Sequence, residues 1–168
     1  MCTRSALTLC ATMRWAVQEI RFYTGLPDGV RAPRLLGAWN AKLARMGQQG
    51  IVTYTRPLRY AGTPPIAREK GIDVRIALDV VRLARLNCYD VGLILSQDQD
   101  LIEAVNDVKD IAKQQRRWIK MASAFPQSAQ KRLNKGIYGT DWLPIDARMY
   151  ATCTERTPFY GVPGVLTR

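Results

Sequence analysis

The stretch "EKGIDVRIALDVVRLARLNCYDVGLILSQDQDL", Glu69–Leu101, places acidic residues at the ends of two strongly hydrophobic segments. Its first half carries apolar residues at helical spacing, namely Ile72, Ile76, Val80, Leu83 and Ala84. Its second half contains "YDVGLILS" (89–96), a continuous apolar run of strand length, as a strand covered on both faces requires. The stretch therefore predicts a helix that leads into a buried parallel strand.

Strand-like and helical segments alternate along the rest of the chain. Strands are predicted at 17–24, 50–58 and 117–124, and helices at 33–47 and 99–115. Residues 59–71, with two prolines and Gly62, are predicted to be a loop. The alternation predicts one three-layer α/β domain with a mainly parallel sheet. We expect this domain at 17–153, after a poorly defined segment, 1–16, and before a C-terminal tail, 154–168.

Composition and charge restrict the partners. The 168 residues include 25 Lys and Arg against 14 Asp and Glu, a net charge of +11. This bias favours a polyanionic partner, and nucleic acid before a membrane. No segment approaches the ~20 apolar residues of a membrane span, and "MCTRSALTLCATMRW" (1–15) is too interrupted by polar residues for a signal peptide. We expect a cytoplasmic protein that does not contact membranes.

Histidine is absent, which restricts the chemistry. Its absence excludes Ser-His-Asp and Cys-His catalysis, and zinc or haem held by histidine. The four cysteines, Cys2, Cys10, Cys88 and Cys153, are far apart and form no C-x-x-C pair, so reduced thiols are favoured over a disulfide or zinc framework. Any chemistry must use carboxylates, Lys, Tyr, Ser or Cys.

Two aspartates, Asp98 and Asp100, follow the predicted strand at 89–96. In open α/β sheets ligand sites form outside the carboxyl ends of the strands, so these side chains are candidate site residues. The alternative is that one of them merely caps the following helix. Carboxylates without histidine suit Mg²⁺ or Mn²⁺ more than zinc.

Two further aspartates lie on the predicted helix within the opening stretch. Asp73 is in the first turn, near the strand ends, and is favoured as a site residue. Asp79 lies six residues on, about 120° round the helix axis, so both cannot face one point. Asp79 is expected instead to pair with a basic residue such as Arg75 or Arg82.

The segment 109–135 is strongly basic. It has one acid, Asp110, and therefore a charge of 8 − 1 = +7. Such a bias favours a surface that follows the phosphates of a nucleic acid, with Trp118 and Phe125 as candidate stacking groups. The eight cations are Lys109, Lys113, Arg116, Arg117, Lys120, Lys131, Arg132 and Lys135.

Several spaced motifs in 69–105 resemble the central block of the NYN-domain family, a PIN-like nuclease family that includes the LabA-like group. K-G-x-D-V, D-x-x-x-L and Y-D-x-x-x-x-x-S-x-D-x-D occur here in the order of that family. The resemblance covers 17–153 and implies a PIN-like fold. It also implies a metal-dependent ribonuclease whose acids correspond to Asp73, Asp98 and Asp100, with Asp79 in the same motif.

The chain departs from the family pattern in two places. The usual S-G-D-S-D reads "SQDQD" (96–100), with Gln97 and Gln99 replacing small residues. No D-G-x-N occurs before Val17, so the usual first strand and one catalytic aspartate are expected to be missing, and Asp28 is a poor replacement. We therefore expect RNA binding with impaired cleavage, and self-association to cover the exposed sheet.

Two alternatives remain open. The segment "SAFPQSAQKRLNKGIYGTDWLPIDARMY" (123–150) is similar to the branch that contains a bacterial hydroxysuccinoylpyridine hydroxylase, which implies an oxidoreductase using a nicotinamide or flavin. No G-x-G-x-x-G fingerprint supports that reading. The second alternative is a non-catalytic RNA-binding module of the same fold. Asp141 in "GTDW" is either a further acid near the site or a turn or helix cap.

Overall fold

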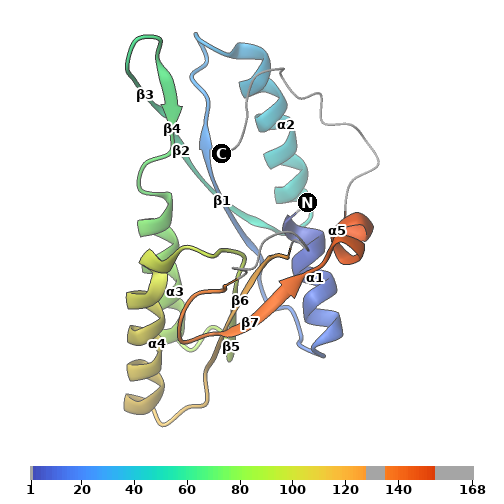
Figure 1. The fold of residues 1–168 in the computed structure, drawn as a ribbon, viewed down its shortest axis with the longest axis vertical. Helices are drawn as coiled ribbons and strands as arrows, with labels where there is room; N and C mark the ends of the chain where they lie inside the picture. The colour runs from blue at the N-terminus through green and yellow to red at the C-terminus, as the bar shows by residue number, and fades with distance from the viewer. Residues whose placement is uncertain (1, 128–134, 154–168) are drawn as a thin grey trace. The chain divides into compact units, whose positions relative to one another are not determined.

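The chain forms two compact units in the computed structural model, which describes residues 2–127 and 135–153. Within those residues, one unit comprises 2–18 and 73–153, and the other comprises 19–72 (Figure 1). Every pairing of strands and every hydrophobic cluster described below lies within one unit.

The unit of residues 19–72 is built on a β-α-β element. Strand β1 (Arg21–Leu26) pairs in parallel with β2 (Val52–Pro57), and α2 (Pro33–Gln48) connects them. Proline suits the first position of α2 because the amide that it lacks would have no partner within the helix. The rings of Phe22 and Trp39 stack with centroids 6.2 Å apart and hold the helix on the strand.

The prediction that residues 59–71 form a loop is wrong in part. β3 (Arg59–Ala61) and β4 (Ile66–Arg68) pair there as an antiparallel hairpin. Gly62 has φ of +92°, a conformation that glycine adopts easily, so glycine and the two prolines form the turn of the hairpin.

The larger unit contains a three-stranded parallel sheet in the order β5-β6-β7. Helix α3 (Ile72–Arg85) precedes β5 (Val91–Ile94). The short helix η1 (Gln99–Leu101) and α4 (Ile102–Gln114) lead to β6 (Lys120–Pro126), and β7 (Asp141–Ile145) is the last strand of the sheet.

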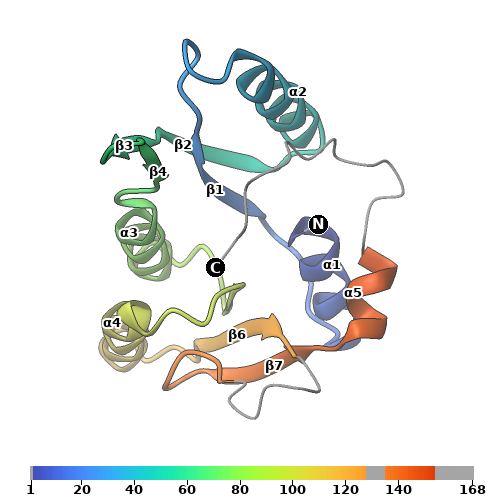
Figure 2. The ribbon, with the colours of Figure 1, turned by 45° about the horizontal axis from the view of Figure 1, so that its top comes forward.

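Helices α3 and α4 run side by side (Figures 1 and 2). Their apolar faces and the sheet form a core whose buried members are Ala84, Ile94, Leu101, Val105, Val108, Ile111, Met121 and Ile137.

Two helices that the sequence did not predict complete this unit. α1 (Cys2–Thr12) and α5 (Ala147–Cys153) lie side by side (Figure 2). Leu9 of α1 packs with Ala124 and Ile145 in a second buried cluster. The residues before β1 thus include a helix, with no strand among those described. In the described parts of the chain, no helix has the length and apolar character of a membrane span.

The α/β class with parallel strands is confirmed. Within the described residues the parallel strands form two groups, β1-β2 in one unit and β5-β6-β7 in the other. Among those residues no strand pairs with the second edge of β1 or of β5. Cys10, Cys88 and Cys153 are free thiols, as expected.

Candidate functional site

The loop that follows β5 carries Asp98 and Asp100. Ser96 Oγ accepts a hydrogen bond from the Asp98 amide at 3.0 Å, and Asp98 Oδ1 accepts one from the Asp100 amide at 3.0 Å. Asp98 is thus the N-cap of η1, the structural role that the sequence left open. Within the described residues its second oxygen, Oδ2, accepts no hydrogen bond. Asp98 is half-buried and Asp100 is exposed.

Gln97 and Gln99, the departures from the family pattern, bind a second loop, 135–140. Gln97 Nε2 donates to the Lys135 carbonyl at 2.9 Å, and Gln99 Nε2 donates to the Gly136 carbonyl at 3.1 Å. Gln99 Oε1 accepts from the Tyr138 amide at 3.2 Å. A side-chain amide both donates and accepts, whereas Gly or Ser at these positions could not span the gap. The sequence singled out both residues but gave no sign of this role.

The structure assigns different environments to the two aspartates of α3. Asp73 lies exposed in the first turn. Since the short turn 86–90 joins α3 to β5, that first turn lies at the same end of the unit as the loop after β5 (Figure 1). Asp79 is 4% exposed and forms a two-point ion pair with Arg75, with N···O distances of 3.1 and 3.0 Å. The expected pairing of Asp79 with a basic residue of its own helix is confirmed.

A divalent cation held by carboxylates needs several of them around one point. Among the described residues, no three side chains of His, Cys, Asp or Glu are grouped closely enough to hold a metal ion. Asp79 is already neutralised by Arg75, and one oxygen of Asp98 caps η1. The described residues therefore do not form a complete metal site.

The two other candidate acids have structural partners. Asp28 Oδ1 accepts from the amides of Val30 and Arg31 at 2.9 and 2.8 Å, and so closes the turn after β1. Asp141, the first residue of β7, accepts from Lys120 Nζ at 2.5 Å.

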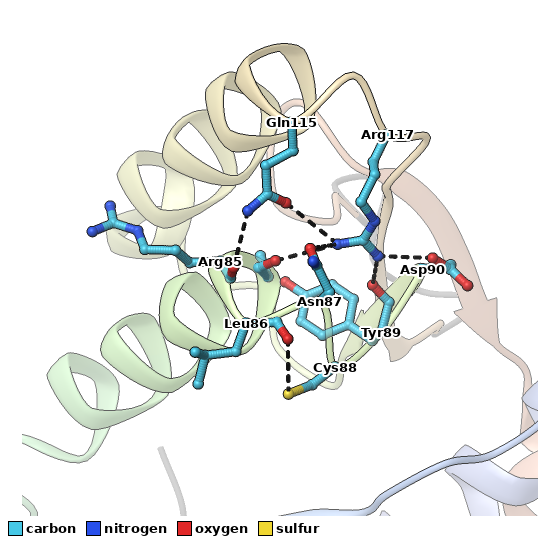
Figure 3. Close-up of polar contacts among 9 residues, drawn as sticks. Arg85, Leu86, Asn87, Cys88, Tyr89, Asp90, Gln115 and Arg117 are labelled. Carbon is cyan, nitrogen blue, oxygen red and sulfur yellow. Dashed lines mark hydrogen bonds and ion pairs between the residues drawn. The ribbon is translucent and has the colours of Figure 1, made fainter.

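Arg117, one of the predicted RNA-binding residues, is held within the protein (Figure 3). Its guanidinium donates to the Tyr89 carbonyl at 2.9 Å and to Asp90 Oδ1 at 2.8 Å, and it also binds the Asn87 side chain. Further contacts at 3.4 Å reach the Ala84 carbonyl and Gln115 Oε1. These bonds join the turn after α3 to the turn after α4, which leaves few donors for a phosphate.

The other cations of 109–135 are spread over different surfaces. Lys113 pairs with Asp110 at 2.8 Å on the exposed face of α4, and Arg116 is exposed in the turn that follows. Lys131 and Arg132 lie outside the described residues. Lys135 is exposed and adjoins the Asp98 loop through its own carbonyl.

The two candidate stacking groups differ in exposure. Phe125 is 3% exposed, because β6 is covered on both faces, so it is not available for stacking. Trp118 is 64% exposed, but it precedes β6 and so lies at the amino ends of the parallel strands. Asp98 follows the carboxyl end of β5, at the opposite end of the sheet.

Comparison with known proteins identifies the family. The model of the NYN domain, a PIN-like nuclease family, matches residues 5–134. This span includes Asp73, Asp79, Asp98 and Asp100 and ends before Lys135. No curated protein and no solved structure matches the chain. Because the matched residues make up most of the chain, it belongs to the NYN domain family.

Proposed function

We propose that this chain is a ribonuclease-type NYN domain that binds RNA and cleaves it slowly. The observation that carries the proposal is the Ser96–Asp100 loop in a chain of this family. Ser96 Oγ and Gln99 Oε1 accept hydrogen bonds and Gln97 Nε2 donates one, and these bonds hold that loop at the carboxyl end of β5, where ligands bind in open α/β sheets. Asp98 and Asp100 are the acids that we place nearest the RNA backbone, with Asp73 as the third.

Slow cleavage follows from the arrangement of the acids. Nucleases of this class generally depend on a divalent metal, for which Mg²⁺ or Mn²⁺ is our proposal. Such an ion activates water and neutralises charge at the phosphate when it is bound. Among the described residues no three acids are grouped closely enough to hold a metal ion, so we propose binding of RNA, rather than rapid hydrolysis, as the main activity.

Binding of RNA is supported by the charge of the chain. A net charge of +11 attracts a polyanion, and exposed cations such as Lys135 and Arg116 are suited to phosphate contacts. Each such contact releases counterions, so the affinity should fall as salt is raised, with a slope of about −0.7 per contact in a log–log plot for a single strand.

The test uses fluorescently labelled single-stranded RNA with the chain and its Asp98→Asn variant, in Mn²⁺ or in EDTA. We expect salt-dependent binding by both proteins, and little cleavage by either. Robust cleavage that EDTA abolishes and Asp98→Asn lacks would overturn the slow-cleavage part. Absence of RNA binding at low salt would overturn the whole proposal, and oxidation of a reduced nicotinamide with a pyridine substrate would then favour the hydroxylase alternative.

A further inference from the structure

An exposed pair of aromatic rings lies beyond the residues that match the family model. Tyr138 is 50% exposed and Trp142 is 41% exposed, and their ring centroids are 6.0 Å apart at an interplanar angle of 60°. Large aromatic side chains at the surface are the groups on which the bases of a single-stranded nucleic acid stack. Both residues follow position 134, where the family match ends.

The Trp142 ring is fixed in orientation. Its Nε1 donates to the Ile137 carbonyl at 2.9 Å, and the ring lies against Gly136, where an added Cβ would be 2.6 Å from Trp142 Cδ1. Ile137 is fully buried, and its amide donates to Ser123 Oγ of β6 at 3.0 Å. A ring held in this way loses little further freedom when a base stacks on it, which favours binding.

The pair is also linked to the Ser96–Asp100 loop, which is called the carboxylate loop below. Gln99 binds the amide of Tyr138, and Gln97 binds the carbonyl of Lys135. Across the sheet, Trp142 is in register with Ser123, which is in register with Ile94, the last residue of β5. Tyr138, in loop 135–140, and Trp142, at the start of β7, are therefore fastened to the loop that carries Asp98.

One lysine lies beside the Tyr138 ring, and a second lies beside Gly139, the residue that follows Tyr138. Lys135 Nζ lies 3.4 Å from Tyr138 Oη and 5.9 Å from the centre of the Tyr138 ring. Lys109 Nζ lies beside Gly139, 2.5 Å from the position that a Cβ would take there. The neighbouring acid Asp141 is paired with Lys120. A base on the rings would thus have ammonium groups near its flanking phosphates.

We propose that Tyr138 and Trp142 form a stacking subsite for one nucleobase of single-stranded RNA, with Lys135 and Lys109 contacting the adjacent phosphates. Gln97 and Gln99 hold this subsite in a fixed place relative to Asp98. The proposal rests on the proposed function and adds where a base of the RNA is held. Stacking is tolerant of sequence because every base has an aromatic face, so the subsite selects unpaired strands rather than a particular base.

The test measures binding in EDTA, so that cleavage plays no part. Affinities of short labelled oligouridylate and oligoadenylate are compared for the chain, Tyr138→Ala, Trp142→Phe and Trp118→Ala. Tyr138→Ala should keep the fold, because the bond to Gln99 uses the backbone amide. It should lose about 5- to 160-fold in affinity, the range for one stacked base. Trp142→Phe should lose less, and Trp118→Ala should change the affinity less than about twofold because Trp118 lies at the opposite end of the sheet.

A second measurement separates stacking from charge. Lys135→Gln should lower the slope of affinity against salt by about 0.7, the value for one phosphate on a single strand, whereas Tyr138→Ala should leave the slope unchanged. Equal affinities of the chain and Tyr138→Ala would overturn the subsite and leave the proposed function standing. An equal loss in Trp118→Ala and Tyr138→Ala would also overturn it. Absence of RNA binding by the unaltered chain would overturn both proposals.

Discussion

Gln99 Oε1 accepts a hydrogen bond from the Tyr138 amide at 3.2 Å, while its Nε2 donates to the Gly136 carbonyl at 3.1 Å. One side chain thus satisfies a donor and an acceptor of a loop that follows it by about forty residues in the sequence. A small residue at position 99 would leave both backbone groups to other partners. The carboxylate loop and loop 135–140 are therefore one joined structure in this chain.

Replacing Gln99 by Ala should loosen loop 135–140 without unfolding the unit. The change removes three intramolecular hydrogen bonds at a half-buried site, two to loop 135–140 and one to the Gln97 carbonyl, and should lower the free energy of unfolding by about 1–3 kcal/mol. Hydrogen exchange should accelerate at the Tyr138 amide. The Ile137 amide, which donates to Ser123 Oγ, is the internal control and should stay protected. Unchanged exchange at Tyr138 would contradict the role given to Gln99.

The pair Arg75–Asp79 predicts a larger effect on stability. Asp79 is 4% exposed, and Arg75→Met would remove the two-point ion pair from its buried carboxylate. Because Arg75 itself is 35% exposed, we expect a loss of about 2–3 kcal/mol in urea unfolding, less than the about 3–5 kcal/mol for a fully buried pair. The double variant Arg75→Met/Asp79→Leu should recover part of the loss. A double variant less stable than Arg75→Met would show that the charge is not the cause.

The strands and helices with strong periodicity were predictable from sequence. α2, α3 and α4 have apolar faces that recur every three or four residues, and the apolar run before Ser96 predicted β5. β7 was missed because "DWLPI" (141–145) has a proline and a charge, and among the described strands it pairs only with β6. α5 was missed because seven residues carry too little periodicity to identify.

The candidate site was only partly predictable. The positions of Asp98 and Asp100 after β5 followed from the order of strand and helix, and the pairing of Asp79 followed from its spacing to Arg75. The contacts of Gln97 and Gln99 join residues about forty positions apart, and no local pattern specifies such pairs. The role of Arg117 could not be read from a basic segment, because charge counts do not show which cations bind backbone carbonyls.

Arg117 should be important for stability and unimportant for RNA binding. Arg117→Gln removes charge-assisted bonds to Asp90, Asn87 and the Tyr89 carbonyl (Figure 3), so we expect a loss of about 2–3 kcal/mol in the free energy of unfolding. Arg116→Gln is the matched control, since it removes the same charge from the neighbouring exposed position. It should leave stability nearly unchanged, and its RNA affinity should be no higher than that of Arg117→Gln. If Arg117→Gln is as stable as the unaltered chain but binds RNA much more weakly, Arg117 contacts RNA and the structural role given to it is wrong.

The last prediction concerns alkaline pH. Burial raises the pKa of the Tyr89 hydroxyl above its ordinary value of about 10, and the nearby Arg117 only partly opposes this. The neutral hydroxyl donates to the Val80 carbonyl at 2.9 Å. A group whose pKa is raised by folding contributes stability that is fully present below the ordinary pKa and is lost as the pH rises above it.

Tyr89→Phe should therefore be less stable than the unaltered chain at pH 8, by about 1 kcal/mol for the lost hydrogen bond. Above about pH 10 the difference between the two should shrink, because the unaltered chain must keep a proton on Tyr89 that its unfolded form releases. Urea unfolding at a series of pH values between about 8 and 11 measures both effects. Tyr138→Phe, a change at a half-exposed tyrosine, is the control and should leave the alkaline loss in place. A constant difference between Tyr89→Phe and the unaltered chain across this range would mean that Tyr89 ionises with similar ease in the folded and unfolded states, against the burial of its hydroxyl beneath α3.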